Sequence, residues 1–144
     1  MPSETESKPD NEQPPDPLVE AMDQHGGKLY WAIKSIARRV ETNESGEITL
    51  LFIKYTVKVG NDGFALIGTL KKLETLDATD ASITNSGTAP LAKLNLMREL
   101  ILDITELGDE GLGPISKLRS LKRLSVSATR VGDLGLKVIA KLRN

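Results

Sequence analysis

The sequence predicts an α/β protein whose repeated strand–helix units stack into a solenoid, and the spacing of its leucines is the first observation behind this prediction. Leucine recurs every 24 residues, at Leu70, Leu94, Leu118 and Leu142. Other apolar positions and glycines keep the same period, among them Gly87, Gly111 and Gly135. A single unit of this size cannot bury its own apolar face, so neighbouring units must stack.

The pattern inside each unit predicts a strand followed by a helix. Leu76 and Ala78 alternate with Thr75 and Asp77, which is the pattern of a strand with one buried face. From Gly87 onward the apolar spacing becomes helical. Short polar residues stand just ahead of the predicted helices, where helix caps are expected: Asn85, Asp109 and Asp133.

Two prolines distinguish the middle units from the outer ones. Pro90 and Pro114 fall inside the predicted helices, and proline is tolerated only in the first helical turn. The middle helices should therefore be short or of 3₁₀ type. The units around Gly63 and Gly135 contain no such proline and should be more helical.

The repeated core motif supports a family resemblance. The core pattern L-x-x-L-x-L appears at 73–78 as LETLDA, at 97–102 as MRELIL and at 121–126 as LKRLSV, with another apolar residue in place of one leucine in each run. Together with the run ATRVGDLGL at 128–136, it resembles the short bacterial leucine-rich-repeat subtype, whose units have the approximate pattern L-x-L-x-x-T-x-V-T-D-x-G-L-x-x-L-x-x-L. The resemblance covers four units, the first of them degenerate: 47–70, 71–94, 95–118 and 119–144.

This resemblance implies a leucine-rich-repeat solenoid with a parallel strand face and short helices on its convex side. It also implies ligand binding on the curved sheet and no catalytic residues. The chain departs from the family pattern in its first two units, where Val57 and Ala81 replace the usual threonine.

The residues before the repeats are expected to form a tail and a cap. Residues 1–27 are acidic and rich in proline, and they end in a glycine hinge, so we expect disorder there. The run 18–22 is the exception, since it could form a short helical turn; the acidic tail could also fold on a partner or shield the basic body. Residues 28–46 are expected to form a capping helix, from Lys28 to about Thr42, and a turn.

Composition limits the compartment and the chemistry. The chain has no cysteine, which excludes disulfides and zinc–cysteine sites. Neither a signal peptide nor a run of the ~20 apolar residues that span a bilayer is evident, so a cytoplasmic protein without membrane insertion is expected. The only imidazole, His25, lies beside flexible glycines, and we expect no catalysis, metal or cofactor.

The predicted binding site lies on the outward side of the strands. Apolar positions there, including Leu51, Ile53, Tyr55 and Ile101, have acidic neighbours, as on protein-binding surfaces. The alternative is that the N-terminal segment covers the first unit. The residues expected to contact a protein partner on this face are Tyr55, Asp77, Glu99, Ile101, Asp103 and Arg123.

Trp31 is a further candidate for partner binding. At helical spacing it points nearly opposite Leu29, beside Lys34 and Arg38, and an exposed tryptophan next to arginine is typical of interface hot spots. The alternative is that the segment around Leu18 and Met22 folds back over it. Basic residues on the opposite side, such as Lys93, are interpreted as a solvated surface, with no nucleic acid as partner.

These observations predict a non-catalytic module that binds a protein of unknown identity through its concave strand face. The apolar side of the last unit suggests an alternative. The chain could be a structural accessory subunit that docks by its C-terminal repeat edge or self-associates there.

Overall fold

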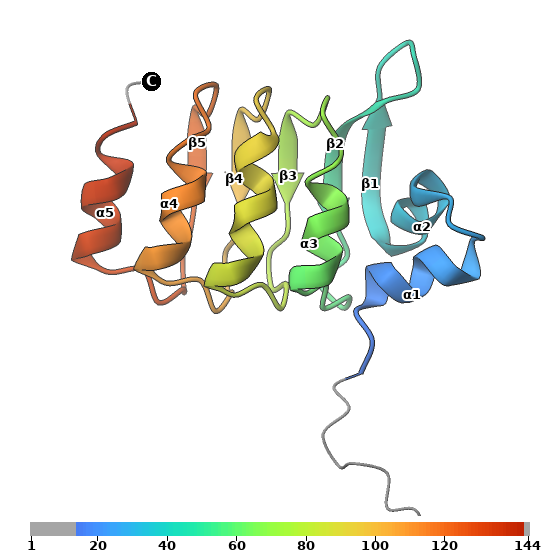
Figure 1. The fold of residues 1–144 in the computed structure, drawn as a ribbon, viewed down its shortest axis with the longest axis horizontal. Coiled ribbons are helices and arrows are strands. Elements are labelled where there is room, and N and C mark those ends of the chain that lie inside the picture. The colour runs from blue at the N-terminus through green and yellow to red at the C-terminus, as the bar shows by residue number, and fades with distance from the viewer. Residues whose placement is uncertain (1–13, 143–144) are drawn as a thin grey trace, which may run out of the picture.

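The computed structural model describes residues 14–142, which fold into one mixed α/β unit (Figure 1). The helices lie on one face of the sheet and leave the other face open. The strands are β1 (Ala37–Thr42), β2 (Ile48–Ile53), β3 (Thr75–Asp77), β4 (Glu99–Ile101) and β5 (Arg123–Ser125). The helices are α1 (Pro17–Gln24), α2 (Leu29–Ile36), α3 (Asn61–Ile67), η1 (Asn85–Lys93), η2 (Asp109–Gly111), α4 (Leu112–Ile115) and α5 (Asp133–Ile139).

The sheet has the order β1-β2-β3-β4-β5 and mixes two strand orientations. Strands β2 to β5 run parallel, as the repeat predicts, with Leu76 paired to Leu100 and Leu100 paired to Leu124. Strand β1 is antiparallel to β2, so the prediction of a wholly parallel strand face is wrong at this edge. The antiparallel strand covers the edge that the first repeat would otherwise expose.

The helix expected from Lys28 to Thr42 ends at Ile36. Residues 37–42 pair with β2 instead, and Val40, assigned to the helix on its spacing from Ile36, lies opposite Leu51. Strand pairing satisfies backbone groups of β2 that a helix would leave open, which explains why it overrides the helical spacing.

Part of the segment that was expected to be disordered is helical. Residues 17–24 form α1, and Asp16 caps this helix by accepting a hydrogen bond from the Leu18 amide at 2.9 Å. Leu18 and Ala21 are buried against the body of the protein, which anchors the helix. The disorder predicted for residues 1–13 concerns a segment outside the described residues.

The types of the helices agree with the prediction made from the prolines. In η1, which contains Pro90, all nine residues are 3₁₀, and the unit with Pro114 has three 3₁₀ residues followed by a four-residue α-helix. The outer helices α3 and α5 are α-helices of seven residues each. The prediction is confirmed, because the proline nitrogen cannot donate the helical hydrogen bond.

Leucine and isoleucine dominate the core, and Phe64 of α3 is the largest fully buried side chain. The inward strand residues Leu51, Leu76 and Leu100 lie in the same continuous cluster. Within the part of the chain that the structure describes, no helix is long and apolar enough to cross a membrane.

A ladder of side-chain acceptors joins each helix start to the next unit. Oδ1 of Asn85 accepts from the Gly108 amide at 2.7 Å, and Oδ1 of Asp109 accepts from the Gly132 amide at 2.7 Å. These residues were expected to cap their own helices, but the caps make no such side-chain bond. The glycine period follows, because a Cβ on Gly111 would lie 2.8 Å from Oδ1 of Asn85.

The N-terminal segment takes part in the same ladder. Oδ2 of Asp16 accepts from the amides of Gly60 at 2.6 Å and Gly63 at 3.0 Å. In the next unit, Asn61 accepts from the Thr84 amide at 3.0 Å through Oδ1. Helix α1 therefore occupies the place of a preceding repeat, although its sequence lacks the repeat pattern.

Candidate protein-binding face

The outward residues of β2 to β5 form two rows across the open face of the sheet, which we call the strand face. Paired residues in adjacent strands set these rows by register. One row contains Leu50, Thr75, Glu99 and Arg123, and the other contains Phe52, Asp77, Ile101 and Ser125. Strand spacing of about 4.8 Å makes the two rows one continuous surface.

The first strand lies one residue out of the predicted register. Leu51 pairs with Leu76, a separation of 25 residues, whereas later pairs are 24 apart. Leu51 and Ile53 are therefore buried, and the prediction that they face outward is wrong. Phe52 takes the outward place opposite Asp77, which puts an aromatic ring on the strand face.

Arginines from β1 extend over the aromatic end of the strand face. The Arg38 guanidinium lies 4.8 Å from the ring centroids of both Phe52 and Tyr55, and Arg39 lies 5.7 Å from the Phe52 ring. The attraction between a cation and an aromatic ring contributes about 0.5–1 kcal/mol at exposed sites. Tyr55 is 49% exposed, so this stacked group remains open to a partner.

Asp77 anchors that arginine instead of facing solvent. Its Oδ2 accepts from the Arg38 guanidinium at 2.5 Å, and its Oδ1 accepts from the amide and hydroxyl of Thr79 at 3.0 and 2.7 Å. Asp77 is only 6% exposed. The structure therefore gives Asp77 a positioning role, since it holds Arg38 against the rings of Phe52 and Tyr55.

The C-terminal half of the strand face is polar. Glu99 pairs with Arg123 at 3.2 Å, and both side chains are partly open to solvent. Asp103 lies just beyond β4 and accepts from the Ser125 hydroxyl at 2.6 Å and the Ser127 amide at 2.7 Å. Ile101 lies between these groups and is half-buried.

The structure therefore brings Tyr55, Asp77, Glu99, Ile101, Asp103 and Arg123 onto or beside one face. Sequence reasoning missed Arg38 and Phe52 as members of this surface. The one available signal was the extra residue between the first two units, which shifts Phe52 outward.

Trp31 belongs to a different surface. It lies on α2, is 53% exposed, and contacts the Tyr30 ring edge-to-face with centroids 5.3 Å apart. Helix α1 packs against α2, yet it leaves Trp31 open, so the alternative that Leu18 and its neighbours cover this ring is wrong. Trp31 offers a separate aromatic contact on the N-terminal cap.

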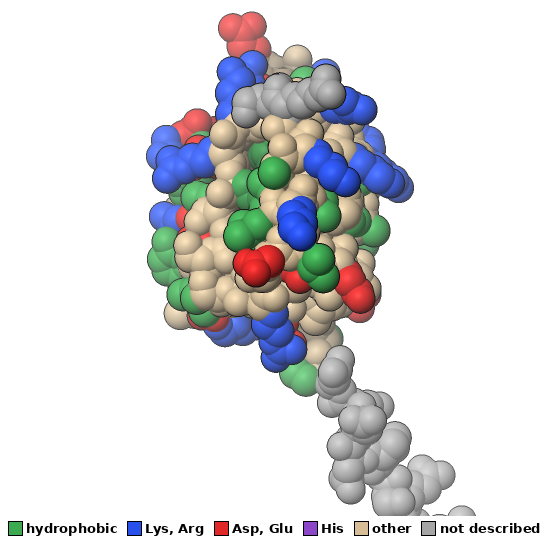
Figure 2. All heavy atoms as spheres, turned by 90° about the vertical axis from the view of Figure 1, so that its left-hand side faces the viewer, with side chains coloured by type: hydrophobic (Ala, Val, Ile, Leu, Met, Phe, Trp, Pro, Cys, Tyr) green, Lys and Arg blue, Asp and Glu red, His purple; other side chains and the backbone are tan. Residues whose placement is uncertain are grey.

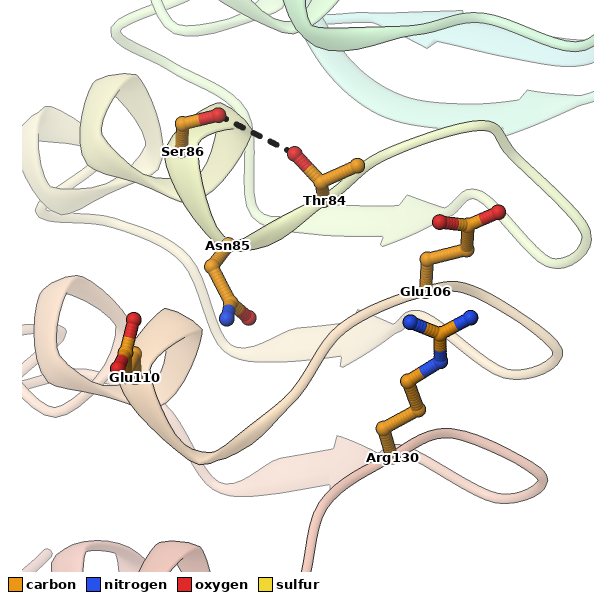
Figure 3. Close-up of a pocket in the computed structure, with 6 residues that line it drawn as sticks. All are labelled: Thr84, Asn85, Ser86, Glu106, Glu110 and Arg130. Atoms are coloured by element: carbon orange, nitrogen blue, oxygen red, sulfur yellow. Dashed lines mark hydrogen bonds between the residues drawn. The ribbon is translucent and has the colours of Figure 1, made fainter.

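A polar groove of about 610 Å³ runs along the loops that precede the helices (Figure 3). It is lined by Thr84, Asn85, Ser86, Glu106, Glu110 and Arg130. The Arg130 guanidinium points toward Glu106, and the hydroxyls of Thr84 and Ser86 lie 3.1 Å apart. The groove is lined by one cation and two carboxylates and is open to solvent, without a nucleophile–base pair among its lining residues.

Two further features considered in the sequence, the periodic lysines and His25, lie outside the strand face. The exposed Lys93, Lys117 and Lys141 keep their period near the helix ends, and His25 is exposed beside Gly26. No group of three or more His, Asp or Glu side chains that could hold a metal ion occurs within residues 14–142.

Comparisons with known proteins find only distant likenesses in structure. No protein-family model and no curated protein matches the sequence. An internalin from Listeria monocytogenes is similar in structure, with 20% sequence identity and a TM-score of 0.46 over 66% of this chain. The match covers 32% of the internalin, so this chain spans about a third of its length.

Proposed function

We propose that the chain is a leucine-rich-repeat solenoid that acts in the cytoplasm as a non-catalytic module and binds a protein partner through the strand face. The observation that carries this proposal is the stacked group of Arg38, Phe52 and Tyr55, in which Phe52 shares a row of the strand face with Ile101. Tyrosine and arginine are enriched among the residues that dominate binding energy at protein interfaces.

The arrangement around this group favours binding. Asp77 holds Arg38 in place, so little side-chain entropy is lost when a partner covers it. Glu99 and Arg123 supply a charged rim that steers a partner and sets orientation more than affinity. An aromatic centre with a polar rim has the anatomy of a protein interface.

The proposal is tested by capture from native lysate with the variant Tyr55→Ala/Arg123→Glu. Both side chains are well exposed, so the fold should survive, and circular dichroism with a thermal scan checks this. We expect a protein captured by the wild type to be reduced at least about tenfold, because losing a hot-spot residue costs at least about 2 kcal/mol.

The matched control is Lys93→Ala/Lys117→Glu, which makes the same kinds of change at exposed positions outside the strand face. This control should capture the partner as well as the wild type does. Equal capture by the Tyr55→Ala/Arg123→Glu variant would contradict binding through the strand face.

A second candidate function is that of an accessory subunit docked by the C-terminal repeat edge. Leu134 and Leu136 of α5 support it, since they are 67% and 56% exposed. In contrast to Phe64 of α3, they have no following unit among the described residues to cover them. The strand-face variant should leave this kind of docking intact.

A further inference from the structure

Backbone donors along β5 and the loop after it lack the partners that earlier repeats have. The Ala78 amide donates to Ile101 at 2.9 Å, and the equivalent Leu102 amide donates to Ser125 at 2.9 Å. Val126 is the next member of this series, and its amide has no following strand to reach within residues 14–142. An edge donor with no strand beside it in the described structure favours an added strand.

A second series of donors stops in the same way. The Asp80 amide donates to Asp103 and the Ile104 amide donates to Ser127, each at 2.8 Å. Ala128 follows by period, again without a strand beside it in the described structure. Two donors at the spacing of a parallel ladder define the register of an incoming strand.

The side-chain ladder ends with an open acceptor. Asn85 and Asp109 each accept an amide of the following unit, and Asp133 is the next residue of that series. Its carboxylate is exposed at the start of α5. An incoming segment that presents a backbone N–H here would repeat the bond between Asp109 and Gly132.

The same end carries apolar side chains. Leu134 and Leu136 are the most exposed large hydrophobic residues of this unit, and Val126, Val131 and Ile139 beside them are half-buried. Figure 2 looks onto this end, where hydrophobic side chains lie among basic ones. Adjacent apolar side chains and an open strand edge are the two features of a strand-addition site.

Charge indicates what kind of segment fits. Residues 119–142 hold six Lys or Arg and one Asp, a net charge of +5, whereas residues 95–118 hold two bases and five acids, a net charge of −3. The basic unit therefore stacks on an acidic one, with the ion pair between Arg123 and Glu99 joining them. The unit that carries the open edge therefore has an excess of positive charge, which favours an acidic partner.

We propose that the C-terminal end of the stack binds an acidic segment of another protein, which adds as a strand parallel to β5. The proposal rests on the second candidate function and names the chemistry of the partner. The segment accepts the Val126 and Ala128 amides, donates an amide to Asp133, and covers Leu134 and Leu136. Its carboxylates face the bases of the last unit.

Charge also argues against a second copy of the chain as the occupant. Two last units placed end to end would bring +5 against +5, and like charges that face each other across an interface repel. A nucleic acid would match the charge, but its phosphates would leave the amides of the strand edge and the two leucines without their preferred partners.

The test uses a labelled synthetic peptide with the sequence of residues 95–112 as the probe. This segment contains β4, which already pairs with β5, and the acids of the third unit. Fluorescence anisotropy measures its binding to the full chain. A matched control peptide carries Gln or Asn in place of every Glu and Asp. The acidic peptide should bind at least about tenfold more tightly and lose affinity as salt rises.

The protein variant is Leu134→Ser/Leu136→Ser, which changes exposed side chains and so preserves the fold. It should bind the acidic peptide at least about tenfold more weakly than the wild type, since the bound segment no longer buries two leucine side chains. The variant Val126→Pro, which removes one edge donor, should weaken binding as well.

Each contrary result has a distinct meaning. Equal binding of the neutral and acidic peptides would overturn the acidic partner while leaving docking at this end in place. No binding of either peptide up to about 1 mM, a limit of about −4 kcal/mol, would overturn both. If single-stranded DNA bound more tightly than the acidic peptide, and bound the Leu134→Ser/Leu136→Ser variant as well as the wild type, the surface would be assigned to nucleic acid. A dimer in light scattering would assign it to a second copy.

Discussion

At the N-terminal end of the sheet, β1 pairs with β2 and α1 packs near α3, whereas at the C-terminal end no further strand follows β5 and no further helix follows α5 within residues 14–142 (Figure 1). The two ends pose the same physical problem, because each repeat exposes a strand edge and an apolar helix face. Asp16 satisfies amides at one end, while Asp133 remains exposed at the other.

The comparison teaches that a cap need not repeat the sequence of the units it covers. It must supply three things: a strand partner for the edge, an apolar side chain for the helix layer, and an acceptor for the amides of the first turn. Val40 in β1, Leu18 in α1 and Asp16 supply them. Within the described residues, the C-terminal end lacks the strand partner and the covering apolar side chain. Its open ladder group is an acceptor, Asp133, because Asp109 already accepts from the Gly132 amide.

The largest expected difference between the ends concerns their leucines. Leu18→Ala should lower the free energy of unfolding by about 2–5 kcal/mol, because Leu18 is fully buried and its loss leaves a cavity. Leu134→Ala should change it by less than about 0.5 kcal/mol, because Leu134 is mostly exposed. Urea unfolding monitored by circular dichroism measures both. Equal effects would mean that the two ends are covered alike.

The two acids at the ends of the ladder give the next contrast. Asp16→Ala should destabilise the fold by about 2–3 kcal/mol, since the amides of Leu18, Gly60 and Gly63 lose a charged acceptor. Asp133→Ala should have little effect, because the Asp133 carboxylate is exposed. Thermal unfolding compares the pair, and Asp16→Asn, which keeps one acceptor oxygen, should recover part of the loss.

The cap also fixes the candidate binding face, through Arg38. Arg38→Gln should lower stability by about 1–2 kcal/mol, because the nearly buried Asp77 loses its cationic partner and two rings lose a stacked cation. The control Arg123→Gln should cost under about 1 kcal/mol, because its pair with Glu99 is largely exposed. If both variants unfolded at the same urea concentration, Asp77 would not need its partner.

Much of the fold could be predicted from periodicity alone. The 24-residue period fixes the parallel pairing of Leu76 with Leu100 and of Leu100 with Leu124, and prolines at 90 and 114 fix the type of the middle helices. The cap could not be predicted in this way. Residues 37–42 have a spacing compatible with both a helix and a strand, and the unpaired edge of β2 decides between them.

The candidate site also could not be predicted fully from the repeat period. One inserted residue before Leu76 exchanges Leu51 for Phe52 on the strand face, and local spacing does not reveal where the insertion falls. The burial of Asp77 also depends on Arg38, 39 positions earlier in the chain. The contacts between the cap and the repeats therefore could not be predicted from the repeat pattern.

The smallest expected effect concerns a turn that the first unit lacks. Asp80, Ile104 and Ala128 have positive φ at equivalent places in the three later units, at 62°, 55° and 53°. A branched side chain is strained there, so Ile104→Asn should stabilise the fold by about 0.5–1 kcal/mol, since asparagine tolerates this conformation. The exposure of Ile104 keeps the loss of packing small.

The comparison with the first unit supplies the control for that substitution. Thr56 is exposed in the corresponding loop, and no non-glycine residue there has a positive φ. Thr56→Asn should therefore leave the midpoint of thermal unfolding unchanged, while Ile104→Asn should raise it by about 1–4 °C. A fall in the midpoint with Ile104→Asn would show that the contacts of this side chain outweigh its backbone strain. The left-handed turn would then persist because Ile104 packs well there.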